Sequence, residues 1–281
     1  MRPVPAQRNS LPIAMFDSGV GGLTVLHECL VSLPHEDFVY LGDTARFPYG
    51  NREAAELREF ALELAGLLLA EGAKLLVVAC NSATAAALPQ LRAELSGSVG
   101  VVAVVEPESR LAARSTRNGR VGLLATPATV ASGAYERALE DTAPDARLHA
   151  VACPELAPMI QAGGEFDQLT VDTVEAYCEP LHNAEVDTVI LGCTHYPLVR
   201  PILQRAVGRG VTLVSSGQAI ADAVHEELVA EGIENDPERR GRYSFLATGD
   251  PEAFRTVGTR FLQLPLGPVR QLEVRDARRA A

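Results

Sequence analysis

Residues 74–84 read KLLVVACNSAT: a short apolar run, then a cysteine, then small polar residues. An apolar run without polar alternation is typical of a strand that is covered on both faces, as in a parallel sheet. Residues 187–197, DTVILGCTHYP, repeat this order. We therefore predict a duplicated α/β unit, with one cysteine at the carboxyl end of a strand in each copy.

Segments with strand and helix character alternate along nearly the whole chain. In residues 52–70, Leu57, Phe60 and Leu64 recur at helical spacing, and Gly72 is placed to end that helix. Strands are predicted at 11–16, 38–43, 74–79, 100–105, 121–125, 147–152, 187–192, 211–216 and 243–248. Helices are predicted at 24–33, 52–70, from about 84, at 129–140, 168–182, from about 197, at 219–232 and 253–262.

This alternation indicates an α/β fold with mainly parallel sheets. About ten strands are too many for one doubly wound sheet in 281 residues, so we expect two sheets. We predict a first domain that combines residues 11–103 and 214–265, and a second domain, residues 104–213, inserted into it. Residues 1–10 and 270–281 are expected to be flexible tails.

The charge balance argues against a nucleic-acid-binding protein. Lys and Arg total 25 while Asp and Glu total 36, a formal net charge of −11, whereas nucleic-acid binding needs a basic surface. The chain contains no run of about 18 apolar residues, so the sequence predicts no membrane-spanning helix. The polar start MRPVPAQRNS lacks the apolar core of a signal peptide. We expect a cytoplasmic protein that binds neither nucleic acid nor membrane.

Polar residues gather where the predicted strands end. In open α/β sheets, ligands bind at the carboxyl ends of the strands. The residues at these ends are Asp17 and Ser18; Asp43 and the loop RFPYG at 46–50; Cys80, Asn81 and Ser82; and Cys193, Thr194 and His195. If the two units face each other, Cys80 and Cys193 face each other across one cleft.

Two opposed thiols suit the inversion of a carbon that bears an acidic hydrogen. One thiolate removes the proton and the opposite thiol returns one to the other face. Cys80 and Cys193 each precede a predicted helix, whose N-terminus favours a thiolate. The alternative is that both are small buried hydrophobic residues, but their polar neighbours favour a functional role. We expect Cys29, Cys153 and Cys178 to be such buried residues.

Other residues of these loops have a structural alternative. Asp17 suits a turn or a helix cap as well as a site. Tyr49 and Gly50 suit a simple turn, and His195 suits a structural role as well as tuning of the Cys193 thiol.

The glycines of DSGVGG at 17–22 match neither a Walker loop nor the GxGxxG pattern. We expect them to let backbone N–H groups approach an anion at the start of the next helix. No His, Cys or carboxylate pairs have the spacing of metal ligands. We therefore predict neither a metal nor a cofactor.

The chain resembles the bacterial glutamate racemases, cofactor-independent enzymes that supply D-glutamate for peptidoglycan. The resemblance extends from about residue 12 to about residue 265. It is carried by FDSGVGGLTVL (16–26), YLGDTARFPYG (40–50), VVACNSATAAAL (77–88), VVEP (104–107), ACP (152–154) and LGCTHYPLV (191–199). It implies two pseudo-symmetric α/β domains with the active site in the cleft between them, glutamate as the small-molecule substrate, and a homodimer.

By motif position, the resemblance implies that Cys80 takes the proton of the D-isomer and Cys193 that of the L-isomer. Asp17 and His195 are implied to assist these two cysteines. The residues implied to hold the carboxylates and ammonium of the amino acid are Asp17, Ser18, Tyr49, Gly50, Asn81, Ser82, Thr84, Thr194 and His195.

The chain departs from the family's pattern at three positions. After ACP the family usually has a stretch like LFVPLVE, whereas residues 155–161 read ELAPMIQ. Gln161 stands in the place of a glutamate that is thought to assist catalysis, and Leu156 replaces the phenylalanine. The usual Glu-Pro-Gly ends in Glu108 instead. These changes bear on the rate and on the balance between the two directions.

We therefore expect a racemase that interconverts L-glutamate and D-glutamate by a two-thiol mechanism. One alternative is a racemase of another amino acid, such as aspartate. A second is a hydrolase that uses Cys193 and His195, which leaves Cys80 and Asp17 without a task. A third is a relative that binds glutamate but has lost catalysis, and Gln161 is the feature that favours it.

Overall fold

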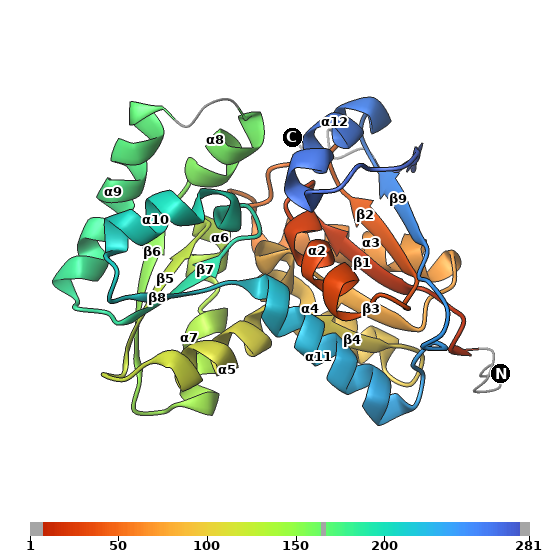
Figure 1. Ribbon diagram of the computed structural model, residues 1–281, viewed down its shortest axis with the longest axis horizontal. Coiled ribbons are helices and arrows are strands. Elements are labelled where there is room, and N and C mark those ends of the chain that lie inside the picture. Colours follow the sequence, from red (N-terminus) through yellow and green to blue (C-terminus); the bar gives the residue numbers. More distant parts are fainter. Residues whose placement is uncertain (1–7, 164–166, 276–281) are drawn as a thin grey trace.

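The computed structural model describes residues 8–163 and 167–275, and its strands form two sheets (Figure 1). The larger sheet contains β1 (Ile13–Asp17), β2 (Phe38–Gly42), β3 (Leu75–Val78), β4 (Gly100–Ala103), β9 (Tyr243–Ala247) and β10 (Val269–Gln271). The smaller sheet contains β5 (Arg120–Ala125), β6 (Arg147–Ala152), β7 (Thr188–Gly192) and β8 (Thr212–Val214). The predicted α/β fold with two sheets is confirmed.

Every strand pairing within the described residues is parallel. The strand order is β10-β9-β2-β1-β3-β4 in the larger sheet and β6-β5-β7-β8 in the smaller one. The first four strands of each unit thus share one order: second, first, third, fourth. Because β3 and β7 hold the same place, the two cysteines that follow them, Cys80 and Cys193, stand at equivalent strand ends.

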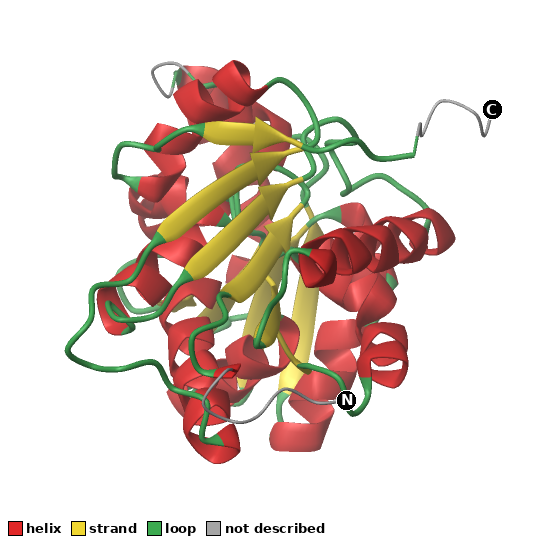
Figure 2. Cartoon of the chain, turned by 90° about the vertical axis from the view of Figure 1, so that its right-hand side faces the viewer, coloured by secondary structure: helices red, strands yellow, loops and turns green. Residues whose placement is uncertain are grey.

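Helices connect the strands and cover both faces of the larger sheet (Figure 2). They are α2 (Leu23–Ser32), α3 (Ala54–Ala70), α4 (Asn81–Leu95), α5 (Val105–Ser115), α6 (Pro127–Ala131), α7 (Ala134–Thr142), α8 (Leu156–Ala162), α9 (Gln168–Asn183), the 3₁₀ helix η1 (Tyr196–Val199), α10 (Arg200–Val207), α11 (Ser216–Glu231) and α12 (Pro251–Leu262). As predicted, α3 buries Leu57, Phe60 and Leu64. It ends before Gly72, whose φ of +82° favours glycine.

Two predicted segments differ from the structure. The helix expected over 129–140 is broken into α6 and α7, because Gly133 adopts a left-handed backbone with φ +64°. The strand expected over 100–105 ends at Ala103, and α5 begins at Val105. The apolar run continues across this strand–helix boundary, so the pattern concealed α5.

The carboxyl end of the chain also differs from its prediction. Residues 270–281 were expected to be a flexible tail, but Arg270 and Gln271 pair with Leu246 and Ala247 in β10. A three-residue edge strand between prolines and polar residues is too short to be recognised from the sequence pattern. The other tail residues, 1–7 and 276–281, lie outside the described part. The bounds of the two predicted domains stay a prediction.

The two sheets share one apolar core. Ile13 and Met15 of β1 belong to a buried cluster that continues to Leu123 and Ile190 of the smaller sheet. The alternate residues of β1, including Phe16, belong to a second cluster on the other face of the sheet. β1 is thus packed on both faces. This packing fixes the position of its last residue, Asp17, at the end of the sheet that faces the other unit. In the described parts of the chain, no helix is long and apolar enough to cross a membrane.

Candidate active site

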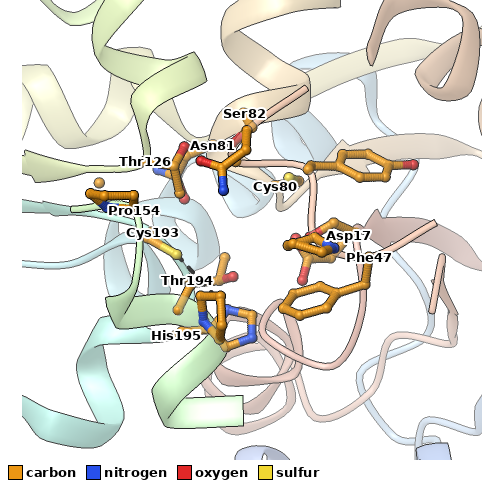
Figure 3. A pocket seen from close by; sticks show the side chains of 18 residues that line it. Asp17, Phe47, Cys80, Asn81, Ser82, Thr126, Pro154, Cys193, Thr194 and His195 are labelled. Atoms are coloured by element: carbon orange, nitrogen blue, oxygen red, sulfur yellow. Dashed lines mark hydrogen bonds between the residues drawn. The ribbon is translucent and has the colours of Figure 1, made fainter. Parts of the chain in front are cut away.

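A cavity lies where the carboxyl ends of both sheets meet (Figure 3). Its walls come from the segments that follow β1, β2 and β3 of the larger sheet and β5 and β7 of the smaller one, together with the start of α8. Figure 3 shows Cys80 and Cys193 on opposite sides of it. Its volume of about 30 Å³ leaves room for about one or two water molecules. This space is smaller than an amino acid.

Cys80 is the N-cap residue of α4. Its backbone is extended, and its Sγ accepts a hydrogen bond from the Ala83 N–H at 3.5 Å. Burial raises the pKa of this thiol well above its usual range, and the nearby Asp17 raises it further. The N–H groups of Ala83 and Ser18 act in the opposite direction. The predicted help from the helix N-terminus is present, but burial outweighs it.

Cys193 follows β7, and its Sγ lies 3.8 Å from Nδ1 of His195. The predicted helix after it begins as the 3₁₀ helix η1, and α10 begins only at Arg200. Burial raises the pKa of the Cys193 thiol, while the His195 N–H lowers it. Burial therefore favours the protonated thiol at both cysteines.

His195 is held between the two units of the molecule. Its Nε2 lies 2.9 Å from Oε1 of Gln161, and its ring contacts the rings of Phe47 and Phe261. An amide oxygen only accepts, so Nε2 carries the proton and Nδ1 is left to accept from the Cys193 thiol. Burial, and to a smaller extent the charge of Arg260, lowers the pKa of His195 to about 3. The ring is therefore neutral at neutral pH.

Asp17 is the last residue of β1 and is fully buried. Its Oδ2 accepts the Gly22 N–H at 2.8 Å, while Oδ1 has no partner among the described residues. Burial raises its pKa, and the Gly22 N–H and the Cys80 thiol lower it. The glycines of this loop were expected to bring an N–H to an anion. For Gly22 that anion is Asp17 itself.

Most of the other predicted ligand-binding residues lie around the same cavity. Those that line it are Ser18, Tyr49, Gly50, Asn81, Ser82 and Thr194. The Ser82 hydroxyl lies 2.9 Å from that of Thr126, which belongs to the opposite unit. The serine and threonine hydroxyls and the backbone around Gly50 offer hydrogen-bond donors from both units.

Two predicted residues are engaged elsewhere. The Tyr49 hydroxyl donates to Oδ2 of Asp43, so Tyr49 faces the cavity without a free hydroxyl. The Thr84 hydroxyl donates to the Val78 carbonyl at 3.3 Å, and Thr84 is not part of the cavity wall. Thr84 therefore supports the junction between β3 and α4, and its contact with a ligand stays a prediction.

Sequence reasoning missed Thr126 and the role of Phe47. Thr126 directly follows β5 and lines the cavity, so the strand-end rule used for the other residues would have found it. Phe47 belongs to the loop that was singled out after β2, but its contact with His195 depends on how the two units pack.

Within residues 8–163 and 167–275, no group of three or more His, Cys, Asp or Glu side chains is arranged to hold a metal ion. The cavity is lined by two thiols, the carboxyl group of Asp17 and the imidazole of His195. These are groups for moving protons.

Comparison with known proteins places this arrangement in a class. Residues 25–224 match the family model described as Asp/Glu/hydantoin racemase. The chain belongs to this family of racemases, which makes it an isomerase. The glutamate racemase of Beutenbergia cavernae is 47% identical over 261 residues, which is 89% of each chain. This relative confirms the resemblance that the motifs predicted.

Solved structures agree with this assignment. A glutamate racemase isoform from Bacillus anthracis superposes with a TM-score of 0.90 at 34% identity, covering 95% of this chain and 98% of that one. The glutamate racemase of Francisella tularensis, solved in complex with D-glutamate, gives a TM-score of 0.88 at 29% identity, covering 94% and 98%. Both similarities extend over nearly the whole of each chain.

Proposed function

We propose that this protein interconverts L-glutamate and D-glutamate, with Cys80 and Cys193 as the two acid–base groups. The observation that carries the proposal is the pair of thiols at equivalent strand ends, on opposite sides of one cavity. The glutamate racemase relatives support glutamate as the substrate. The product D-glutamate serves peptidoglycan synthesis, as in the family that the motifs resemble.

The reaction needs one thiolate and one thiol in each turnover. With L-glutamate bound, the Cys193 thiolate takes the Cα proton from one face, and the electron pair is delocalised into the adjacent carboxylate. The Cys80 thiol then gives its proton to the opposite face of Cα. The product is D-glutamate, with a Cys80 thiolate and a Cys193 thiol left behind. D-glutamate reacts by the same steps in reverse.

The buried thiols require help to ionise. Asp17, next to Cys80, accepts the proton of that thiol, and Nδ1 of the neutral His195 accepts that of Cys193. The ammonium of the substrate adds a positive charge to a buried site, which lowers the pKa of nearby thiols. Substrate binding therefore favours the thiolate that acts as the base, and it also places the Cα proton of the substrate beside that thiolate.

The cavity binds an amino acid with two carboxylates but has no cationic side chain of its own. No Lys or Arg lines it within the described residues. Hydroxyl groups and backbone N–H groups therefore hold the two carboxylates, and Asp17 and Asn81 face the ammonium. Closure of the two units over the substrate excludes water and strengthens these interactions.

Two further properties belong to the same proposal. We infer that the enzyme works in the cytoplasm, where peptidoglycan precursors are made, and that it is a homodimer. Light scattering coupled to size-exclusion chromatography measures the mass directly. Twice the chain mass of 29.9 kDa is expected, and a monomeric mass at all concentrations would contradict the dimer.

A substrate panel tests the proposed reaction. Purified protein is incubated with L-glutamate, D-glutamate, L-aspartate and D-aspartate, and the enantiomers are separated by chiral chromatography. We expect equal final amounts of the two glutamates from either side, and no conversion of aspartate. Conversion of aspartate alone would replace glutamate as the substrate, and binding of glutamate without conversion would favour a non-catalytic relative.

Gly21 lies directly against Thr194 and His195 of the opposite unit. A Cβ atom at this position would lie 2.3 Å from Oγ1 of Thr194 and 2.5 Å from Nδ1 of His195. The substitution Gly21→Ala must displace both side chains, so we expect kcat/KM to fall by roughly 10²-fold. Gly66→Ala is the matched control, because nothing lies within 4 Å of a Cβ there. Equal activity of the two variants would show that this contact is unimportant.

Gln161 gives Nε2 of His195 an uncharged hydrogen-bond partner. In Gln161→Glu, a carboxylate beside Nε2 stabilises the imidazolium, so the pKa of His195 rises from about 3. The variant should then gain a histidine titration in its kcat/KM profile between about pH 5 and 8 that the parent lacks. Gln161→Met removes the hydrogen bond without adding charge, and should lower activity without the new step. Identical profiles for parent and Gln161→Glu would refute this role.

A further inference from the structure

Glu108 is a fully buried carboxyl group of α5 that does not line the cavity. Its Oε1 accepts a hydrogen bond from Oγ of Ser216 at 2.6 Å. Its Oε2 accepts from Nδ2 of Asn81 at 3.1 Å and from the hydroxyl of Tyr135. No Lys or Arg of the described chain forms an ion pair with it. Burying a carboxyl group costs free energy unless its oxygens are bonded, so these three donors keep it in place.

The three donors come from three different helices. Asn81 is the first residue of α4 and directly follows Cys80, Tyr135 lies on α7, and Ser216 is the first residue of α11. Hydrogen bonds to Glu108 therefore connect the N-terminus of α4, next to Cys80, with α7 and α11.

Both hydrogens of the Asn81 amide are donated to this group of side chains. Nδ2 donates to Oε2 of Glu108 at 3.1 Å and to the Tyr135 hydroxyl at 2.7 Å. The other amide atom, Oδ1, is buried and has no partner among the described residues. Asn81 is one of the side chains that line the cavity (Figure 3). An amide held in this way offers the cavity only its oxygen, which is a hydrogen-bond acceptor.

We propose that Glu108 is a positioning residue for the reaction: it orients the Asn81 amide so that Oδ1 accepts a hydrogen bond from the α-ammonium of the substrate. The inference rests on the proposed function, since it assigns a substrate group to Oδ1. Burial raises the pKa of Glu108 to about 7. Above this pH, the reversed amide would place its oxygen against the ionised Glu108 carboxylate, two acceptors with no proton between them. A carboxylate at position 108 therefore excludes the reversed orientation, which would present an N–H to the ammonium.

A double-mutant cycle on KM for D-glutamate tests the proposal. Asn81→Ala removes the acceptor of a charged group, so KM should rise about tenfold. Glu108→Ala frees the amide and should raise KM by about the same factor, with a smaller effect on kcat. Because Glu108 acts through Asn81, the double variant should match Asn81→Ala alone. Independent effects would multiply to about a hundredfold and would overturn the inference.

Two further variants separate positioning from stability. Glu108→Gln keeps an oxygen that accepts from Asn81 and fills the same volume, so KM should stay within about twofold of the parent value. Glu106→Ala removes another carboxylate of α5, one that bridges to Arg92 of α4 at 2.6 Å, and should leave KM unchanged. If Glu108→Ala does not fold, a raised KM in Glu108→Gln would still contradict the proposal. If the parent protein fails to racemise glutamate, the proposed function fails instead.

Discussion

The substitution Cys193→Ser is expected to lower the racemisation rate of L-glutamate by at least roughly 10³-fold. Serine fits the space of the buried thiol, but its hydroxyl is far less acidic and does not form the anion that takes the Cα proton. Cys80→Ser should have an effect of the same size, because each turnover uses both groups. Chiral chromatography of the products over time measures both losses.

The two serine variants should differ in hydrogen exchange. In deuterated water, Cys193→Ser keeps the Cys80 thiolate and should still exchange the Cα hydrogen of D-glutamate without inverting it. Cys80→Ser should do the same for L-glutamate. Cys178→Ser is the matched control, since Cys178 is buried in α9 away from the cavity. Racemisation at the parent rate in either active-site variant would refute the two-thiol mechanism.

The second large effect is expected for Asp17→Asn, with a fall in kcat of roughly 10²- to 10³-fold. Asparagine preserves the volume and still accepts from the Gly22 N–H, but it neither takes the Cys80 proton nor carries a negative charge. The loss should be larger with D-glutamate, since Cys80 acts on that isomer. Asp222→Asn, an exposed position on α11, serves as the control.

The pH dependence gives a second signature of Asp17. Burial raises the pKa of Asp17 above its ordinary value of 3.8. The carboxylate form is the active one, so activity should fall as the pH drops through this raised pKa, at a higher pH than an exposed aspartate would give. Asp17→Asn should lack this acidic limb. An unchanged acidic limb in the variant would assign it to another group.

Much of the fold could be predicted because its strands are buried on both faces. Runs such as 74–79 and 187–192 are apolar after their first one or two residues, and they predict strands within two residues of those observed. The helices and strands that the sequence pattern did not predict are those without a clear local signal. α5 begins inside an apolar run, α8 contains a proline, and β10 has three residues.

The candidate site was predicted to a similar extent and for a similar reason. Cys80, Cys193 and Asp17 stand at strand ends, and a strand end can be recognised from the sequence alone. The contacts that tune these groups could not be. The bond from His195 to Gln161 joins residues 34 apart, and the bond from Asn81 to Glu108 joins residues 27 apart. Both depend on how separate helices pack around the cavity.

The most direct test of two-thiol racemisation is proton NMR of L-glutamate with the purified enzyme in deuterated water. The signal of the Cα hydrogen and the amount of D-glutamate are followed in the same sample. We predict that the Cα signal is lost as D-glutamate appears, with deuterium at Cα of every D-glutamate formed from the L-isomer. Formation of D-glutamate that keeps its Cα hydrogen, or no exchange at all while glutamate still binds, would contradict the mechanism.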